Sequence, residues 1–321
     1  MSPLFGKQAP KPFIDPARGD AEAQRLRQAA GAGDWRSVEV ALSATREAPR
    51  REFLADAVAM NCEDLGWVDA WVREQPESQT ARLMWGACAV QLAWKVRSGL
   101  APRYVSSDQM KGFHDWLNHA QEQLNAAATM TPGDSAPWVA LLWCGVGLGI
   151  PIDDARVRFD NAISRNPQTE LAALAYTTHI GPRWNGDPDL MWTFIRDLTE
   201  RESEGSPRWS LVPHGHLEQW VSDRMRGGSA VHPSRYWEQA EVQGDINDAY
   251  AKYLGSPAKR HSYLEPQFRE LFAGCFYLMG ARDKLRKELE LIGPGIQGLP
   301  WGYLGSSLVA YQSAREAAGL K

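Results

Sequence analysis

The residues between positions 179 and 187 combine side chains that can recognise an anion. His179, Arg183 and Trp184 lie in a short turn, and Asp187 follows directly behind it. An arginine guanidinium is a planar fork that matches a carboxylate or a phosphate, and a tryptophan offers a flat apolar wall. Together these side chains could bind an anionic group. The structural alternative is a corner in which Arg183 bonds helix-end carbonyls and Trp184 fills the gap between two hairpins.

Arg97 joins this candidate site if the helices form a regular array. In such an array the first helices of successive hairpins run parallel, so their C-terminal ends share one edge. Arg97 ends one such helix, and His179 with Arg183 ends another. We therefore expect Arg97 and Arg183 to line the same rim. A structure that places them beyond the reach of one ligand would contradict this expectation.

His214 and His216 form an H-x-H pair that could hold a metal ion. Imidazoles two residues apart can share a metal when the segment is extended, whereas on a helix they point apart. A third ligand is needed, and His179 or Asp187 could supply it. The alternative is a loop-to-helix junction in which one histidine helps the helix to begin.

The sequence lacks the common catalytic and nucleotide-binding motifs. It contains no HExxH, no Walker A loop, no GxSxG elbow and no CxxC pair. Gly145, Gly147 and Gly149 superficially suggest a phosphate loop. No strand precedes them and their spacing is wrong for a dinucleotide site, so helix packing or helix termination explains them better.

The four cysteines are far apart and have neither metal-site nor redox-motif spacing. They are Cys62, Cys88, Cys144 and Cys275. They indicate buried thiols of a reducing compartment. The sequence therefore predicts no cofactor, and it leans against an enzyme without excluding one.

Composition and charge restrict the class of protein and its partners. The chain has 321 residues, of which 44% are hydrophobic and 23% charged, as is ordinary for a globular protein. A formal net charge of -4 without a basic block argues against nucleic acid. The apolar run after Pro132 is too short to span a membrane. Residues 1–19 are polar and Pro-rich without an export signal, which predicts a flexible lead-in and a cytoplasmic protein.

A repeat organises the middle of the chain. Two segments share a small residue, a large apolar residue four positions on, a small residue seven positions on and a proline twelve positions on. These are Ala120, Leu124, Ala127 and Pro132, and then Ala155, Phe159, Ala162 and Pro167. The two registers lie 35 residues apart, close to the 34-residue period of the tetratricopeptide hairpin. The alternative is two unrelated amphipathic helices followed by ordinary loops.

Helical periodicity and capping signals extend along most of the chain. Ser106 with Gln109 forms a possible capping box, and Asp187 with Pro188 is a strong helix start. Later helices are expected over 217–225, 233–242 and 245–254. Alternating strand patterns are absent, so a sheet is not expected. We predict an all-α fold, a right-handed tetratricopeptide-like α-α superhelix with divergent repeats, as one domain over 20–321 with its best register at 107–167.

Several segments resemble an uncharacterised actinobacterial family of tetratricopeptide-like helical proteins, classed as a domain of unknown function. The segments are Trp71–Pro76 (WVREQP), Ala93–Arg97 (AWKVR), Pro182–Gly186 (PRWNG) and Pro300-Trp301, spread over roughly residues 65 to 305. This chain has Ser98 between Arg97 and Gly99, where the family more often runs from arginine straight into glycine. The resemblance implies a helical repeat fold and brings no catalytic residues.

Two functions are consistent with these features. The first is a protein-interaction or scaffold module, because helical repeats present extended surfaces to protein partners. A tetratricopeptide carboxylate clamp is not expected, since the helix over 136–149 carries no Lys, Arg or Asn. The alternative is a small-molecule-binding protein or an enzyme, with a polar pocket where the His179 turn meets His214 and His216.

Overall fold

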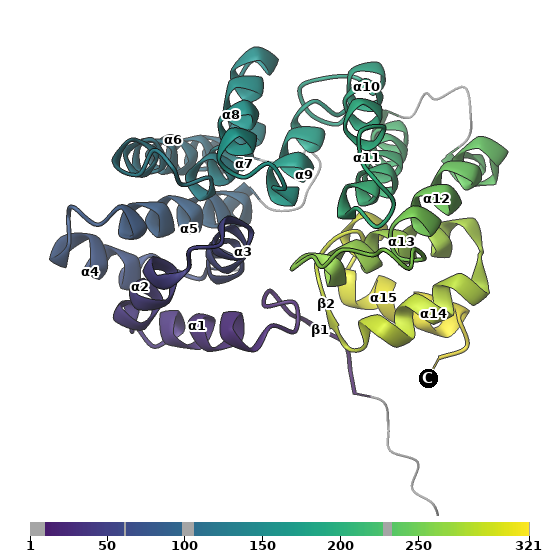
Figure 1. The fold of residues 1–321 in the computed structure, drawn as a ribbon, viewed down its shortest axis with the longest axis horizontal. Helices are drawn as coiled ribbons and strands as arrows, with labels where there is room; N and C mark the ends of the chain where they lie inside the picture. Colours follow the sequence, from purple (N-terminus) through teal and green to yellow (C-terminus); the bar gives the residue numbers. More distant parts are fainter. Residues whose placement is uncertain (1–9, 61, 98–105, 227–232, 321) are drawn as a thin grey trace, which may run out of the picture. The chain divides into compact units, whose positions relative to one another are not determined.

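The computed structural model of this chain describes residues 10–60, 62–97, 106–226 and 233–320 (Figure 1). This part of the chain forms fifteen α-helices and one pair of two-residue strands, which confirms the predicted all-α class. Ser98 and Gly99, where the sequence departs from the family pattern, lie outside it. None of the described helices combines the length and the apolar character needed to cross a bilayer.

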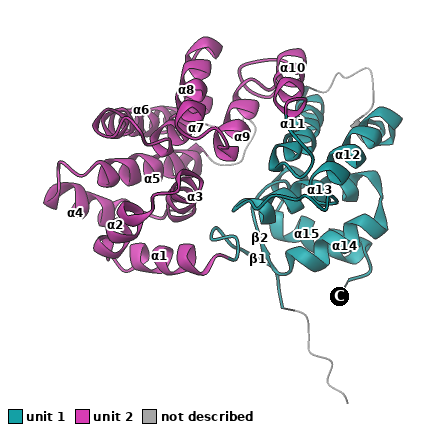
Figure 2. Cartoon of the chain, in the orientation of Figure 1, with its two compact units in different colours: residues 1–19, 202–321 teal, residues 20–201 magenta. Residues whose placement is uncertain are grey.

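Residue contacts divide the chain into two compact units (Figure 2). Unit 2 spans residues 20–201, and unit 1 combines residues 1–19 with 202–321. The single helical-repeat domain over 20–321 stays a prediction, because a division by contacts does not show whether the two units fold separately.

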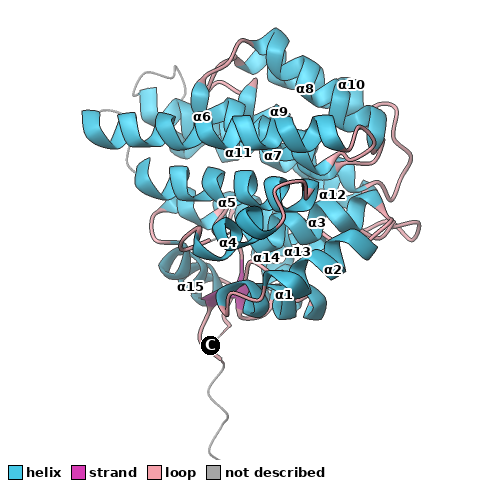
Figure 3. Cartoon of the chain, turned by 90° about the vertical axis from the view of Figure 1, so that its left-hand side faces the viewer, coloured by secondary structure: helices cyan, strands magenta, loops and turns pink. Residues whose placement is uncertain are grey.

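The described residues of unit 2 form ten α-helices. They are α1 (Ala21–Gly31), α2 (Trp35–Ala44), α3 (Ala48–Ala59), α4 (Gly66–Glu74), α5 (Gln79–Arg97), α6 (Ser107–Met130), α7 (Ala136–Leu148), α8 (Ile152–Arg165), α9 (Glu170–His179) and α10 (Pro188–Thr199). Each odd-numbered helix contacts the next odd-numbered one, from α1 through α9. The even-numbered helices α2, α4, α6 and α8 contact the odd-numbered helix that follows them. Figure 3 shows the long helices α5 and α6 side by side.

The predicted register positions of α6 and α8 are buried. They are Ala120, Leu124 and Ala127 on α6, and Ala155, Phe159 and Ala162 on α8. Close approach of α5 to α6 depends on a glycine, because a Cβ at Gly86 would lie 2.5 Å from Leu124 Cγ. No residue of α7 is exposed, as its nearly continuous apolar sequence leads one to expect.

Local capping signals predicted two helix starts correctly. Ser106 and Gln109 form the reciprocal capping box at the start of α6. The Asp187 carboxylate accepts a hydrogen bond from the Leu190 backbone N–H at 2.9 Å, and Pro188 occupies the first turn of α10.

Arg51 on α3 forms a polar anchor, because its side chain contacts residues at or next to the ends of three other helices. The Arg51 guanidinium donates to Asp134 at 2.8 Å, just before α7, and to Thr80 Oγ1 at 3.3 Å, at the start of α5. It also donates to the backbone carbonyl of Leu42 on α2. Because Arg51 and Asp134 are both buried, this ion pair needs the additional hydrogen bonds that surround it.

The neighbouring Glu52 anchors the segment between α8 and α9. Its carboxylate accepts from Asn166 Nδ2 at 2.9 Å and from Thr169 Oγ1 at 2.8 Å. The Thr169 hydroxyl also caps α9 by accepting from the Ala172 N–H at 3.2 Å. Adjacent residues of α3 therefore fix the segments from which α5, α7 and α9 begin.

Five α-helices lie in the described residues of unit 1. They are α11 (Leu211–Arg226), α12 (Ala240–Lys252), α13 (Glu265–Met279), α14 (Arg282–Ile292) and α15 (Ser307–Ala317), with short 3-10 helices at Pro207–Ser210, Pro233–Glu238 and Trp301–Leu304. The structure differs from the predicted helices at two places. The helix predicted over 217–225 begins earlier, at Leu211, and the helices predicted over 233–242 and 245–254 become a 3-10 helix followed by α12. A glycine inside a helix is tolerated at a modest cost, and Gly244 lies within α12 in open space.

Residues inside the predicted lead-in form a strand. β1 (Phe13–Ile14) pairs in parallel with β2 (Gly295–Ile296), although the sequence suggested no sheet. A two-residue strand is too short to show an alternating pattern, and its partner lies at the far end of the chain. The Gln297 side chain holds this contact by donating to the Asp15 carbonyl.

The anchor on α3 gives a stability prediction with an internal control. Arg51→Met leaves the Asp134 carboxylate buried without its cation, and we expect a loss of about 3–5 kcal/mol in the free energy of unfolding. Arg36→Met removes an ion pair with Glu74 in which both side chains are more than half exposed, and it should cost less than about 1 kcal/mol. Urea unfolding of both variants measures the difference, and equal losses would contradict the proposed anchor.

Candidate functional site

The residues expected to form a rim come together in unit 2. Arg97 lies in the last turn of α5, and Arg183 with Trp184 lies in the turn between α9 and α10. The guanidinium carbons of Arg97 and Arg183 lie 5.6 Å and 5.2 Å from the centroid of the Trp184 ring. We call Trp94, Arg97, Arg183 and Trp184 the Arg97 corner. Both guanidiniums therefore lie against one ring, and a shared ligand at this position stays a prediction.

Three aromatic rings surround the Arg97 guanidinium. Its carbon lies 5.7 Å from the Trp94 centroid and 5.9 Å from the Phe113 centroid, in addition to the contact with Trp184. Trp94 packs edge-on against Trp184 at 5.3 Å, and against Phe113 at 5.0 Å. Such contacts attract a cation to the ring faces. Burial lowers the pKa of Arg97, and the nearby charge of Arg183 lowers it further.

Gly147 explains how α7 fits beside these rings. A Cβ at this position would lie 2.5 Å from Leu117 Cδ1, 2.7 Å from Phe113 Cζ and 3.3 Å from Trp94 Cζ2. Gly149 ends α7 in the left-handed region, with φ of 63°. These glycines therefore serve helix packing and helix termination, as the sequence analysis favoured over a phosphate loop.

His179 supports the corner from within the core. Its Nε2–H donates to the Ile150 carbonyl at 3.1 Å, which leaves Nδ1 to accept from Asn185 Nδ2 at 3.3 Å. Burial lowers the pKa of His179 to about 4; the Ile150 hydrogen bond opposes this effect and the charge of Arg158 adds to it. The neutral imidazole thus connects the α7–α8 junction to the turn that carries Arg183 and Trp184.

Asp187 acts as the cap of α10 in this structure. The turn before it is compact, because the Asn185 N–H donates to the His179 carbonyl at 3.1 Å. A Cβ at Gly186 would lie 2.0 Å from the Ile180 carbonyl oxygen, so this turn accepts only glycine without rearrangement. Of the five predicted binding residues, Arg97 and Arg183 contribute guanidiniums and Trp184 contributes a ring. His179 and Asp187 instead hold the turn and the start of α10 in position.

The histidine pair lies in the other unit and on a helix. His214 and His216 belong to the first two turns of α11, where residues two apart point in different directions. His216 Nδ1 lies 2.8 Å from the Tyr236 hydroxyl, and its Nε2 lies 3.4 Å from Asp245 Oδ2. Throughout the described ranges, no group of three or more His, Cys, Asp or Glu side chains is placed to hold a metal.

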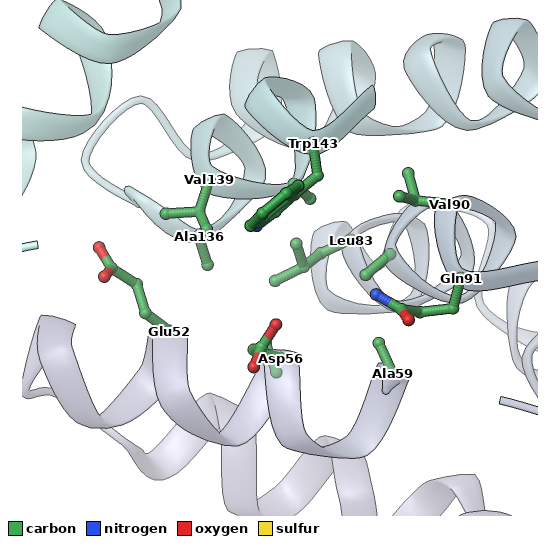
Figure 4. A pocket seen from close by; sticks show the side chains of 12 residues that line it. Glu52, Asp56, Ala59, Leu83, Val90, Gln91, Ala136, Val139 and Trp143 are labelled. Atoms are coloured by element: carbon green, nitrogen blue, oxygen red, sulfur yellow. The ribbon is translucent and has the colours of Figure 1, made fainter. Parts of the chain in front are cut away.

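Unit 2 contains a groove, which we call the inner groove, that the sequence analysis did not predict. It is lined by Glu52, Ala55, Asp56 and Ala59 of α3, by Leu83, Ala87, Val90 and Gln91 of α5, and by Ala136, Val139, Ala140 and Trp143 of α7. Figure 4 shows the Trp143 ring and the Asp56 carboxylate directed into it from opposite helices. Its narrow cavity of about 30 Å³ takes one or two waters. Two carboxyl groups and no basic side chain line it.

Glu52 links this groove to the anchor on α3. Burial raises its pKa to about 7, although the hydrogen bonds from Asn166 and Thr169 favour the charged form. The negative charge of Asp134 raises the pKa further. Glu52 is therefore a carboxyl group that changes charge near neutral pH.

Two cysteines far apart in the sequence lie together in unit 2. The thiols of Cys62 and Cys88 interact closely enough to shift each other's pKa, and the Cys62 thiol donates a hydrogen bond to the Asp64 carbonyl at 2.9 Å. The interaction with Cys88 is the main cause that lowers the pKa of Cys62 to about 7, against the opposing effect of burial. Cys88 is fully buried, and its pKa is raised well above the usual value. The sequence analysis missed this pair because it searched for short cysteine spacings.

The titration of Glu52 gives a pH prediction. Its carboxyl has a pKa of 4.5 in the unfolded chain and about 7 in the folded one. Between these values only the folded state holds the proton, so the free energy of unfolding falls as pH rises, by about 3 kcal/mol in all. Glu52→Gln removes this dependence, whereas Glu74→Gln, at an exposed carboxylate, keeps it. Urea unfolding from pH 5 to pH 8 checks this, and parallel curves for wild type and Glu52→Gln would contradict it.

The cysteine pair gives a prediction about reactivity. Cys62 should react with iodoacetamide with a half-maximal rate near pH 7, because the thiolate is the nucleophile. Cys88→Ala removes the stabilising interaction and should move this midpoint towards 9, whereas Cys275→Ala, at a buried thiol in unit 1, should leave it unchanged. Mass spectrometry of the labelled peptides follows each site. A midpoint that does not respond to Cys88→Ala would show that the pair does not set the pKa.

Comparison with known proteins adds no assignment. No family model, no curated protein and no solved structure matches this chain. The resemblance to the uncharacterised actinobacterial family therefore stays a prediction from its four sequence segments.

Proposed function

We propose that this chain is a protein-interaction module built on a tetratricopeptide-like array of helical hairpins, wound as a right-handed α-α superhelix. Two features of unit 2 support the array. Successive odd-numbered helices contact one another, and the register positions of α6 and α8 are buried. Repeats of this kind gain stability from their neighbours and offer extended surfaces to protein partners.

The inner groove is the observation that carries this proposal. The odd-numbered helices α3, α5 and α7 each contribute side chains spaced by about one helical turn (Figure 4). Several of these residues are alanines, which leave the backbone accessible to a partner lying along the face. A cavity of about 30 Å³ is too small to enclose a metabolite, whose pockets usually measure about 300 Å³ or more. The groove suits side chains that a protein partner inserts from outside.

The charge of the groove selects a basic partner segment. Glu52, Asp56 and Gln91 are the polar residues that line it. α7 contributes only apolar side chains there, so a carboxylate clamp has no cation to offer. A lysine or arginine side chain could lay its apolar stem over the alanines and Trp143, and direct its charge to Asp56. We therefore propose a cytoplasmic protein with a basic segment as the partner, rather than nucleic acid or a membrane.

The alternative function, a small-molecule-binding protein or an enzyme, keeps one supporting observation. Arg97 and Arg183 meet at Trp184, as a site for an anion requires. His214 and His216 belong to the other unit, and their helix directs them apart. We place this alternative second, because its candidate residues lie in two different units.

A charge change at Gln91 tests the interaction module. Gln91 lines the groove from α5 and is half-buried. Gln91→Lys places a cation where the basic segment would bind, and we expect roughly tenfold weaker retention of a stoichiometric partner. Gln91→Glu, the matched control, should retain the partner at least as well as wild type. Both variants and wild type serve as baits in a host lysate, with circular dichroism as the folding check.

The identity of the captured segment decides the outcome. Cross-linking to the groove should recover a peptide rich in lysine or arginine. A partner retained equally by Gln91→Lys and Gln91→Glu, or one cross-linked through an acidic segment, would show that the groove is not the binding face. Loss in an Arg183→Ala/Trp184→Ala variant alone would place the contact at the Arg97 corner instead.

A further inference from the structure

Two polar groups that line the inner groove have no hydrogen-bond partner among the described residues. They are the side-chain amide of Gln91 on α5 and the indole N–H of Trp143 on α7, and both side chains are half-buried. Neither group is fully enclosed by protein, so both can reach a partner in the groove. A side-chain amide both donates and accepts hydrogen bonds, and an indole N–H only donates. The groove therefore offers hydrogen-bonding groups of both kinds.

These two groups lie opposite a row of side chains on α3. Figure 4 shows Glu52, Asp56 and Ala59 following one another along that helix. Across from them lie the Trp143 ring and, nearer to Ala59, the Gln91 amide. Residues four apart on a helix are about 6 Å apart along its axis. Alternate side chains of an extended chain are about 6.6 Å apart, so an extended peptide running along α3 would place them beside successive turns.

A helical partner matches the inner groove less well than an extended one. An α-helix with its side chains is about 10–12 Å across, and it pairs most of its own main-chain groups. The enclosed space of about 30 Å³ admits the end of a side chain and not a helix. An extended chain instead carries N–H and C=O groups that require partners. Gln91 and Trp143 can supply these partners, whereas a helix would leave both groups unused.

We propose that the inner groove binds its basic partner as an extended peptide, with the Gln91 amide and the Trp143 indole N–H hydrogen-bonded to the peptide main chain. Lysine or arginine side chains at alternate positions direct their charge to Asp56 and Glu52, and the side chains between them point away from the groove. Main-chain hydrogen bonds supply affinity in such complexes, and alternate side chains supply specificity. This inference rests on the proposed interaction module, because it states the conformation of the segment that binds there.

The test compares the binding of three synthetic peptides of equal charge to the full chain. The first alternates lysine with valine, which favours an extended chain. The second is the same peptide with N-methylated main-chain amides, which cannot donate. The third carries its lysines on an alanine-rich helix held by a covalent staple. Fluorescence anisotropy of the labelled peptides at pH 8 and constant ionic strength measures each affinity. We expect the first peptide to bind at least about fivefold more tightly than the other two, because each of those lacks main-chain hydrogen bonds to the groove.

Substitutions that remove hydrogen-bonding groups without changing charge locate the contact. Gln91→Leu removes the amide, and Trp143→Phe keeps an aromatic ring while removing the N–H. Each should weaken binding of the first peptide about fivefold. Gln91→Leu should matter less for the N-methylated peptide, which has already lost its donors. Gln28→Leu, at an exposed position of α1, is the matched control and should bind like wild type. Circular dichroism checks the folding of each variant.

Failure of this inference and failure of the proposed function give different results. If all three peptides bind equally, the groove recognises basic charge without the main chain, and only this inference is overturned. The same holds if Gln91→Leu and Gln28→Leu bind the first peptide alike. If neither the first peptide nor the helical peptide binds to wild type, the basic partner itself is wrong and both proposals fall.

Discussion

The buried polar pair Arg51–Glu52 is the constraint on which the arrangement of unit 2 depends. These two adjacent residues of α3 contact the starts of α5, α7 and α9 through Thr80, Asp134 and Asn166. The hydrogen-bond partners of Glu52 lie up to 117 residues from it in the sequence. A buried charge that loses its partner costs several kcal/mol, so these contacts specify one arrangement of helices more strictly than apolar packing alone.

The C-terminal ends of α5 and α9 bring together aromatic rings and arginines, unlike the buried, hydrogen-bonded groups at their N-terminal ends. There α5 contributes Trp94 and Arg97, and the turn after α9 contributes Arg183 and Trp184. The anchored ends are buried and satisfied by protein partners, whereas Arg97 has aromatic contacts and no acceptor in the described ranges. Satisfied buried polar groups stabilise a fold, so the anchored ends of these helices contribute to stability in a way that the aromatic contacts of Arg97 do not.

Local signals in the sequence predicted the elements, and periodicity predicted part of the site. Asp187 and Ser106 cap their helices as expected, because a cap depends on residues within one turn. Arg97 and Arg183 both contact the Trp184 ring, as the predicted shared rim requires. The anchor of Glu52, the Cys62–Cys88 contact and the pairing of β1 with β2 were missed. Each joins segments that no local rule relates, so only the folded chain shows them.

The acidic groove and the basic Arg97 corner would affect charged ligands differently. The chain carries a formal net charge of -4, which at low salt would repel an anion from any part of the surface. At physiological ionic strength the Debye length is about 8 Å, so distant carboxylates are screened while two guanidiniums that contact one ring still act together. Glu52 makes the charge of the groove depend on pH, because burial raises its pKa to about 7. Raising the pH through that range makes the groove more negative and leaves the arginines charged. A change of pH would therefore alter the affinity of the proposed basic partner more than the affinity of an anion.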